Sequence, residues 1–164
     1  MIKIAFFDFS RTIAKRTGFG AGPIFLGRGK EYNELYQKYQ SKKLNEGDFV
    51  KSVGKLWKGF KEKNLPKIYS KIELNPNVRT TLKILKKQGI KLALVSNIPA
   101  KLAEFYKNLG FDFVSGTVFE IRNGIFTGKV LKINANKFEA VKRICKNAKI
   151  RPNECIAIGD AIGD

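Results

Sequence analysis

Polar side chains stand at the ends of three apolar runs in this sequence. Asp8 ends the run that begins at residue 2, Ser96 ends the run at 91–96, and Asp160 follows the run at 155–159. Short apolar runs of this kind predict strands that are buried on both faces of a parallel sheet. The carboxyl ends of such strands meet at one edge of the sheet, where ligands bind. The sequence therefore predicts that the three side chains converge, although they lie far apart along the chain.

The residue inventory limits the chemistry that this edge could do. The chain has no histidine, and its two cysteines are Cys145 and Cys155. A structural zinc site and Ser/His/Asp or Cys/His catalysis are therefore excluded. Carboxylates, hydroxyls, lysines and a hard metal ion remain. These groups suit phosphoryl transfer, which needs a nucleophile, cations that neutralise the phosphate oxygens, and donors that hold them.

Four motifs, in order along the chain, resemble those of the haloacid dehalogenase superfamily, and within it the phosphoserine-phosphatase-like subgroup. The family's motifs are an apolar strand followed by Asp-x-Asp-x-Thr or Val, an apolar strand ending in Ser or Thr, a lysine, and Gly-Asp-x-x-x-Asp. The matching segments here are Ile4 to Thr12, Leu92 to Asn97, Lys137 in Asn134-Ala-Asn-Lys, and Gly159-Asp160-Ala-Ile-Gly-Asp164. The resemblance covers nearly the whole chain.

The resemblance implies a nucleophile and a metal site. Asp8 would attack phosphorus and become an aspartyl phosphate. Mg²⁺ would be held by Asp8, by the backbone carbonyl of Ser10 and by Asp160, with Asp164 acting through a water molecule. This all-oxygen set is of the kind that Mg²⁺ prefers. An aspartate at a strand end can also be an ordinary turn or cap residue, which is the structural alternative for the carboxylates.

The resemblance also implies a phosphate-binding set. Ser96, Asn97, Thr12 and Lys137 would bind the phosphate oxygens, and Lys137 would restrain the charge on Asp8. Simpler explanations exist for two of these positions. Ser96 with Asn97 can cap the next helix, and Lys137 can be one of many surface lysines.

One departure from the family pattern affects catalysis directly. The second aspartate of the first motif, which serves the family as general acid and base, is replaced here by Ser10. A hydroxyl group cannot readily donate a proton to a leaving alkoxide or activate water, and such help is worth ~10²–10⁴-fold in rate. We therefore expect slow hydrolysis of ordinary phosphate monoesters. Acyl phosphates and phosphoanhydrides should be affected least, because their leaving groups need little protonation.

Two further departures concern the substrate and the end of the chain. The subgroup places an acidic residue for the substrate amine near Thr17, but residues 15–17 carry no carboxylate, so phosphoserine is not the expected substrate. Arg11 and the basic residues that follow it suit a more anionic one. The chain stops at Asp164, where the family continues into a further helix and strand. We therefore expect the strand at 155–159 to lie at an exposed edge, where two copies of the chain could pair as a homodimer.

The elements that must position these residues follow from hydrophobic periodicity. Residues 13–29 are rich in glycine and predict an irregular connection. Residues 30–72 show helical spacing without an intervening strand, which indicates consecutive helices. Asn123-Gly124 predicts the turn of a β-hairpin. We expect an α/β fold with a Rossmann-like parallel sheet, a small β-hairpin and an inserted helical cap at 14–74, with residues 1–13 and 75–164 forming the core.

Composition and charge bound the remaining possibilities. Apolar residues make up 43% of the chain and the formal net charge is +18. Residues 1–8 reach an aspartate too soon for a signal peptide, and no apolar run approaches the ~20 residues of a membrane span, so we expect a cytoplasmic protein with no membrane partner. The lysines are scattered over predicted helix faces. Scattered lysines favour a solvated surface over a nucleic-acid patch.

The sequence thus favours a Mg²⁺-dependent phosphohydrolase or phosphotransferase that acts on a small phosphorylated metabolite and is weakened by Ser10. Two alternatives remain open at this point. One is a catalytically degenerate protein that binds metal and phosphate for regulation, as Ser10 would allow. The other is a nucleic-acid end phosphatase, which the charge of +18 would suit.

Overall fold

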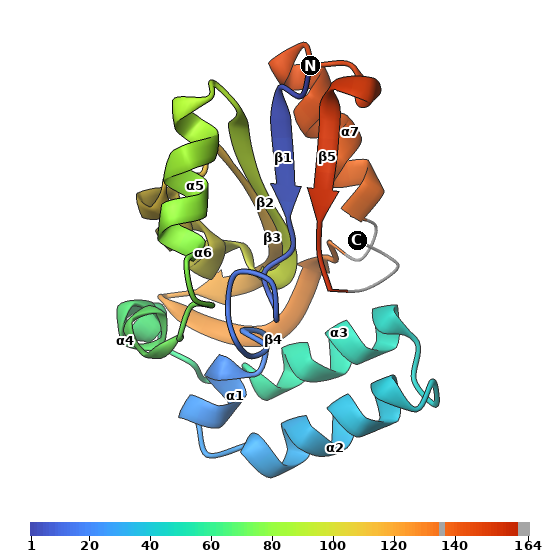
Figure 1. Ribbon diagram of the computed structural model, residues 1–164. Helices are drawn as coiled ribbons and strands as arrows, with labels where there is room; N and C mark the ends of the chain where they lie inside the picture. The colour runs from blue at the N-terminus through green and yellow to red at the C-terminus, as the bar shows by residue number, and fades with distance from the viewer. Residues whose placement is uncertain (135–136, 161–164) are drawn as a thin grey trace.

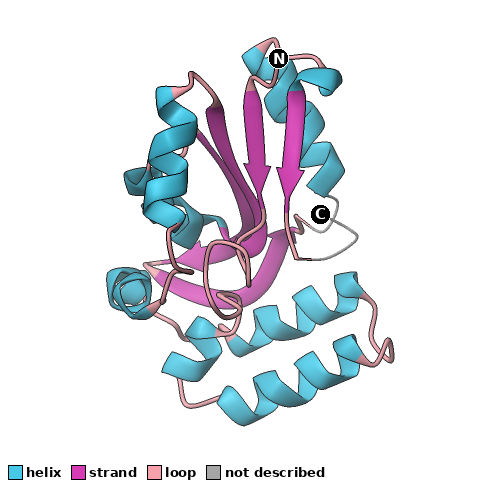
Figure 2. Ribbon diagram, viewed as in Figure 1, coloured by secondary structure: helices cyan, strands magenta, loops and turns pink. Residues whose placement is uncertain are grey.

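Five strands form one sheet at the centre of the molecule (Figures 1 and 2). The structure is a computed structural model and describes residues 1–134 and 137–160. The sheet order is β4-β3-β2-β1-β5. Neighbouring strands are parallel except β3 and β4, which form an antiparallel hairpin. The strands are β1 (Ile4–Phe7), β2 (Lys91–Pro99), β3 (Phe113–Arg122), β4 (Ile125–Lys132) and β5 (Cys155–Ile158). The expected α/β class with a mostly parallel sheet is confirmed.

Helices cover both faces of the sheet and the edge beyond its carboxyl ends. Figure 1 shows α5 and α6 against one face, α7 against the other, and α2 and α3 beyond the arrowheads of β1 and β5. The α-helices are α1 (Ala21–Phe25), α2 (Gly29–Gln40), α3 (Glu46–Leu56), α4 (Leu65–Lys71), α5 (Val78–Lys87), α6 (Ala100–Ala103) and α7 (Lys137–Ala148). Short 3₁₀ helices lie at Glu62–Asn64, Glu104–Leu109 and Pro152–Glu154.

Alternate residues of the central strands enter two separate hydrophobic clusters. In β1, Ala5 and Phe7 belong to the cluster on the α5 side, whereas Ile4 and Phe6 pack with residues of α7. All four residues of this strand are buried. Burial on both faces explains why the strand is an uninterrupted apolar run instead of an alternating one.

The segment that holds α1 to α4 leaves and re-enters the core at adjacent points. Ala14 and Leu74 form an antiparallel bridge, and the Asn75 amide donates a hydrogen bond of 2.9 Å to the Ile13 carbonyl. These contacts lie at the expected limits of the cap. The division into two domains stays a prediction, because the buried side chains of α3 and of the sheet belong to one continuous hydrophobic cluster.

Two elements of the structure have features that the sequence pattern does not predict. Residues 113–122 form one continuous strand, β3, which includes Gly116. Gly116 interrupts its pattern because a Cβ there would lie 2.6 Å from the Ile98 carbonyl oxygen. The expected irregular stretch 13–29 contains α1, whose Gly22 packs directly against the ring of Trp57. Both glycines therefore mark close packing, which the sequence pattern alone does not distinguish from a loop.

Glu154 makes the amino-terminal end of the sheet sensitive to acid. Its side chain is 8% exposed, and the carboxylate accepts hydrogen bonds from Arg151 and from Lys3, at 3.1 and 2.8 Å. The Arg151 and Lys3 side chains lower the pKa of Glu154 from 4.5 to about 2. A lowered pKa means that this stabilisation is present above pH 4.5 and is lost as the pH falls toward about 2.

We therefore expect the urea concentration at the midpoint of unfolding of the wild-type protein to decrease as the pH is lowered from about 4.5 to about 2. In Glu154→Gln the contribution of Glu154 to this decrease should be missing, because glutamine does not titrate. Urea unfolding curves of both proteins at several pH values test this. Parallel pH dependence in the two proteins would contradict it.

Among the residues that the structure describes, no helix combines the length and the apolar composition that crossing a membrane requires.

Candidate active site

A cavity of about 350 Å³ lies at the carboxyl ends of the parallel strands. It is bounded on one side by the ends of β1, β2 and β5 and on the other by α2 and the start of α3. Its lining residues are Asp8, Ser10, Arg11, Thr17, Phe19, Tyr36, Tyr39, Gln40, Glu46, Phe49, Ser96, Asn97, Lys137 and Asp160. The predicted convergence of Asp8, Ser96 and Asp160 is therefore present.

Asp8 and Lys137 form the central ion pair of this cavity. The Lys137 Nζ lies 2.9 Å from Asp8 Oδ1, with side-chain exposures of 20% and 8%. Asp8 follows β1 between two buried phenylalanines, Phe7 and Phe9, which fix its backbone. Lys137 is the first residue of α7, 129 positions away in sequence. The sheet edge thus brings a lysine ammonium to a largely buried carboxylate, which is the expected arrangement for restraining a charged nucleophile.

The loop after β1 is held in place from the opposite end of the helical segment. The Asn75 Nδ2 donates hydrogen bonds to the carbonyl oxygens of Arg11 and Thr12, at 3.0 and 2.9 Å. Arg11 has a φ of 63°, in the left-handed region. Its guanidinium lies 3.9 Å from Asp160 Oδ2 and donates a hydrogen bond to the Tyr36 hydroxyl. Arg11 therefore connects the last strand of the sheet to a helix across the cavity.

Ser96 and Asn97 lie in β2 and enter the cavity beside Asp8. Ser96 is 3% exposed, and its carbonyl accepts a hydrogen bond of 2.8 Å from the buried Asn134 side chain. Asn97 Nδ2 donates to Glu46 Oε1 at 2.6 Å. The Ser96 hydroxyl also receives a long contact, 3.5 Å, from the Ile98 amide. Within the described residues β2 continues to Pro99, so both residues belong to a strand.

The structure brings together most of the predicted site residues. Asp8, Ser10, Ser96, Asn97, Lys137 and Asp160 line the same cavity. Thr12 is not among its lining residues, and its hydroxyl oxygen is buried with no hydrogen bond to the described residues. Asp164 lies outside the described residues. The catalytic, phosphate-binding and metal-binding roles of all eight residues stay predictions.

Several lining residues were not identified as site residues from the sequence. Tyr36 and Tyr39 both lie in α2, and Tyr39 stacks on Phe49 with ring centroids 4.6 Å apart. Both tyrosines nevertheless also face the cavity. Glu46 had no sequence signal beyond its place at a helix start. The helical spacing shows which residues share a face, but not which part of that face lies over the sheet edge.

The buried Tyr32 holds Thr17, another residue that lines the cavity. Burial raises the pKa of the Tyr32 hydroxyl to about 12. It lies 3.0 Å from Thr17 Oγ1, to which it donates. Thr17 is the position near which the subgroup would carry an acidic residue, and here a neutral hydroxyl pair occupies it.

The residues of this cavity fit a magnesium ion. Mg²⁺ is commonly held by one or two carboxylates and completes its shell with water and substrate oxygens. Asp8 and Asp160 provide the carboxylates, and the Ser10 carbonyl belongs to the same loop. No group of three or more His, Cys, Asp or Glu side chains gathers as a metal cage within residues 1–134 and 137–160. This set therefore suits Mg²⁺ better than an ion that needs a complete protein shell.

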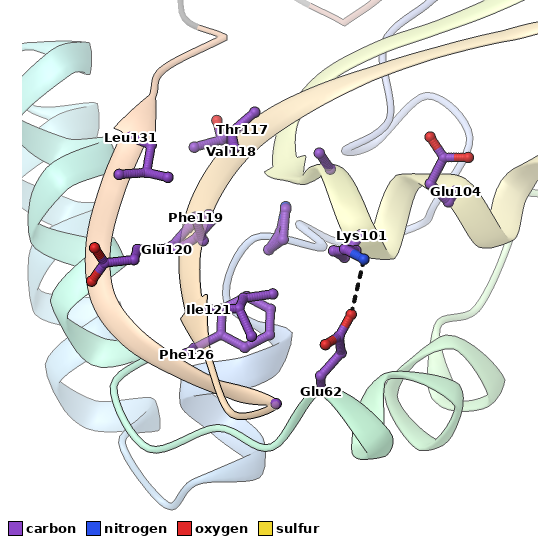
Figure 3. A pocket seen from close by; sticks show the side chains of 13 residues that line it. Glu62, Lys101, Glu104, Thr117, Val118, Phe119, Glu120, Ile121, Phe126 and Leu131 are labelled. Carbon is purple, nitrogen blue, oxygen red and sulfur yellow. Dashed lines mark ion pairs between the residues drawn. The ribbon is translucent and has the colours of Figure 1, made fainter.

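A larger cavity, of about 740 Å³, lies between α6 and the β3–β4 hairpin (Figure 3). It contains none of the predicted site residues. Its carboxylates are already engaged in ion pairs: Glu62 with Lys101 at 3.1 Å, Glu104 with Lys107 at 2.6 Å and Glu120 with Arg122 at 3.0 Å. The predicted site residues line the smaller cavity, which is therefore the better candidate for an active site.

The profile of the haloacid dehalogenase-like hydrolases matches residues 3–164. This chain belongs to that family. The phosphoserine phosphatase of Archaeoglobus fulgidus is 27% identical over 166 residues, covering 99% of this chain and 48% of that protein. The phosphoserine phosphatase of Methanocaldococcus jannaschii is 25% identical, covering 99% of this chain and 79% of that protein. The chain spans about half the length of several curated relatives that it matches.

Solved structures of this family share the fold described above. A HAD family hydrolase from Salmonella enterica serovar Typhi superposes with a TM-score of 0.89 at 23% identity, covering 99% of this chain and 57% of that one. A phosphoserine phosphatase solved as a phospho-aspartyl intermediate analogue superposes with a TM-score of 0.86 at 23% identity, covering 99% and 80%. The family match confirms the predicted membership of this superfamily, and the solved structures share its fold.

Proposed function

We propose that this protein is a Mg²⁺-dependent phosphohydrolase or phosphotransferase that acts on a small phosphorylated metabolite through an aspartyl phosphate on Asp8. The observation that carries the proposal is the Asp8–Lys137 ion pair of 2.9 Å in a cavity shared with Ser96 and Asp160. Family membership and the phosphoserine phosphatase relatives support the reaction class.

In the proposed reaction the Asp8 carboxylate attacks phosphorus and the bond to the leaving oxygen breaks. Lys137 offsets the charge on Asp8 and, with Ser96 and Asn97, holds the phosphate oxygens. Asp8, the Ser10 carbonyl and Asp160 would hold Mg²⁺, with Asp164 through water, and the ion would neutralise phosphate charge. Charge neutralisation and positioning provide most of the catalysis of phosphoryl transfer.

The proposed substrate is anionic and needs little help from an acid. Ser10 lines the cavity where the family carries its general acid, so leaving groups such as acetate should react more readily than alkoxides. Arg11 adds a cation at the rim of the same cavity. Acetyl phosphate is therefore the first substrate to test, together with a panel of phosphorylated metabolites.

We expect release of inorganic phosphate from acetyl phosphate to require Mg²⁺, to stop when EDTA removes the ion, and to return when Mg²⁺ is added in excess. A colorimetric phosphate assay measures the release, and circular dichroism checks that EDTA leaves the fold intact. Equal phosphate release with and without the metal would refute the proposed metal-dependent reaction.

The two alternatives from the sequence, a degenerate regulatory protein and a nucleic-acid end phosphatase, stay predictions. The Mg²⁺ assay also distinguishes the degenerate regulatory protein from the proposed phosphohydrolase, since a degenerate protein would bind phosphate without releasing it from a substrate.

A further inference from the structure

Glu46 places a third carboxylate in the proposed active site. It is the first residue of α3 and lines the cavity from the side opposite the sheet. Among the described residues that line this cavity, the other carboxylates are Asp8 and Asp160. Asp8 is the proposed nucleophile, and Asp160 is a proposed metal ligand. Glu46 is thus the lining carboxylate for which the proposed reaction has no role.

The position of Glu46 is fixed by contacts at both ends. Its backbone is set by the helix start, where Asn45 caps α3 by accepting a hydrogen bond from the Asp48 amide at 2.9 Å. Its carboxylate oxygen Oε1 accepts a hydrogen bond of 2.6 Å from Asn97 Nδ2. The side chain is half-buried. A carboxylate held in this way is positioned before a substrate arrives.

Asn97, which holds Glu46, and Ser10 line the same cavity. The β1–β2 pairing runs up to Phe7 and Leu94, so both residues lie toward the carboxyl end of these strands. The contact with Asn97 therefore places the Glu46 carboxylate in the cavity that Ser10 also lines.

Two cations of the cavity lie against its other two carboxylates. Lys137 lies 2.9 Å from Asp8, and Arg11 lies 3.9 Å from Asp160. The hydrogen-bond partner of Glu46 is instead a neutral amide. That amide engages Oε1 of the carboxylate.

We propose that Glu46 is the general base that activates water for hydrolysis of the aspartyl phosphate, in place of the missing aspartate at position 10. This inference rests on the proposed function. In the step, the water oxygen forms a bond to phosphorus while the bond between phosphorus and the Asp8 oxygen breaks. The water proton passes to Glu46 Oε2 and from there to solvent. Asp8 returns as a carboxylate, and inorganic phosphate leaves.

The decisive variant is Glu46→Gln, because glutamine keeps an oxygen that can accept the Asn97 hydrogen bond but cannot take the proton. With acetyl phosphate and Mg²⁺, formation of the phosphoenzyme needs no proton for the leaving acetate. We therefore expect the phosphoenzyme to accumulate in Glu46→Gln and to decay ~10²-fold more slowly than in the wild type, the lower end of the usual effect of a general base. Rapid quench and intact-protein mass spectrometry measure the phosphorylated fraction over time.

Two comparisons distinguish a structural role of Glu46 from a role as general base. Glu34→Gln, an exposed glutamate of α2 outside the cavity, is the matched control and should decay like the wild type. The second comparison is between the single variant Ser10→Asp and the double variant Ser10→Asp/Glu46→Gln. It tests whether Glu46 does the work of an aspartate at position 10. If Glu46 supplies the missing base, an aspartate at position 10 should largely remove the effect of Glu46→Gln on the decay rate.

The possible failures are distinguishable. If no phosphoenzyme forms on Asp8 in either the wild type or Glu46→Gln, the proposed function fails and the inference fails with it. If phosphoenzyme forms and Glu46→Gln leaves its decay unchanged, the inference alone is wrong. An equal slowing of decay by Glu46→Gln with Ser10 and with aspartate at position 10 would also overturn it, because it would indicate a structural effect.

Discussion

Replacing Asp8 with asparagine should reduce phosphate release by roughly 10³-fold or more, on the scale seen when the nucleophile of a covalent mechanism is removed. Asparagine has nearly the same size as aspartate but lacks the charged oxygen that attacks phosphorus. The site around it should persist, since Asp8 lies between buried Phe7 and Phe9 and follows a strand that is paired on both sides. The loss should therefore be chemical.

Steady-state assays with acetyl phosphate, wild type against Asp8→Asn, give the ratio of kcat/KM. The phosphoenzyme should be absent from the variant. Asp48→Asn, an exposed aspartate in the first turn of α3, is the matched control and should retain activity. Thermal unfolding of each protein shows whether loss of the Lys137 ion pair lowers stability. If Asp8→Asn folds and still releases phosphate at the wild-type rate, Asp8 is not the nucleophile.

The residues at the sheet edge could be predicted because each strand, and the polar residue that ends it, can be recognised within a short stretch of sequence. Each buried strand ends in a polar residue, and parallel pairing brings strand ends together whatever lies between them. This argument is enough to place Asp8, Ser96 and Asp160 in one cavity. Lys137 needed the family motif in addition, because lysine is abundant in the chain and an isolated lysine carries no signal of its own.

The opposite wall of the cavity could not be predicted because it depends on how helices dock. Glu46 and Tyr36 reach the cavity only through the orientation of α2 and α3 over the sheet edge. That orientation is set by long-range packing, such as Gly54 of α3 against Val130 of β4. Hydrophobic periodicity defines the face that a helix buries, but not what it is buried against.

The replacement of the family's acid-base aspartate by Ser10 leads to the second large prediction. Ser10→Asp should raise kcat for an alkyl phosphate monoester by ~10²–10⁴-fold, because a carboxylic acid can protonate the leaving alkoxide. The gain should be much smaller for acetyl phosphate, whose leaving acetate needs no proton. Ser10 lines the cavity beside Asp8, so the new side chain would enter the same space.

The way in which the rate gain of Ser10→Asp depends on the leaving group distinguishes protonation of that group from a general change in the site. Ser10→Asn has the shape of the aspartate variant without its acid, and it should show no gain with either substrate. Measuring kcat for alkyl, aryl and acetyl phosphates in all three proteins gives the slope of rate against leaving-group basicity, which should become shallower only in Ser10→Asp. A uniform rise across the three substrates would contradict leaving-group protonation, because it would show that position 10 acts on a step that all three share, such as hydrolysis of the aspartyl phosphate.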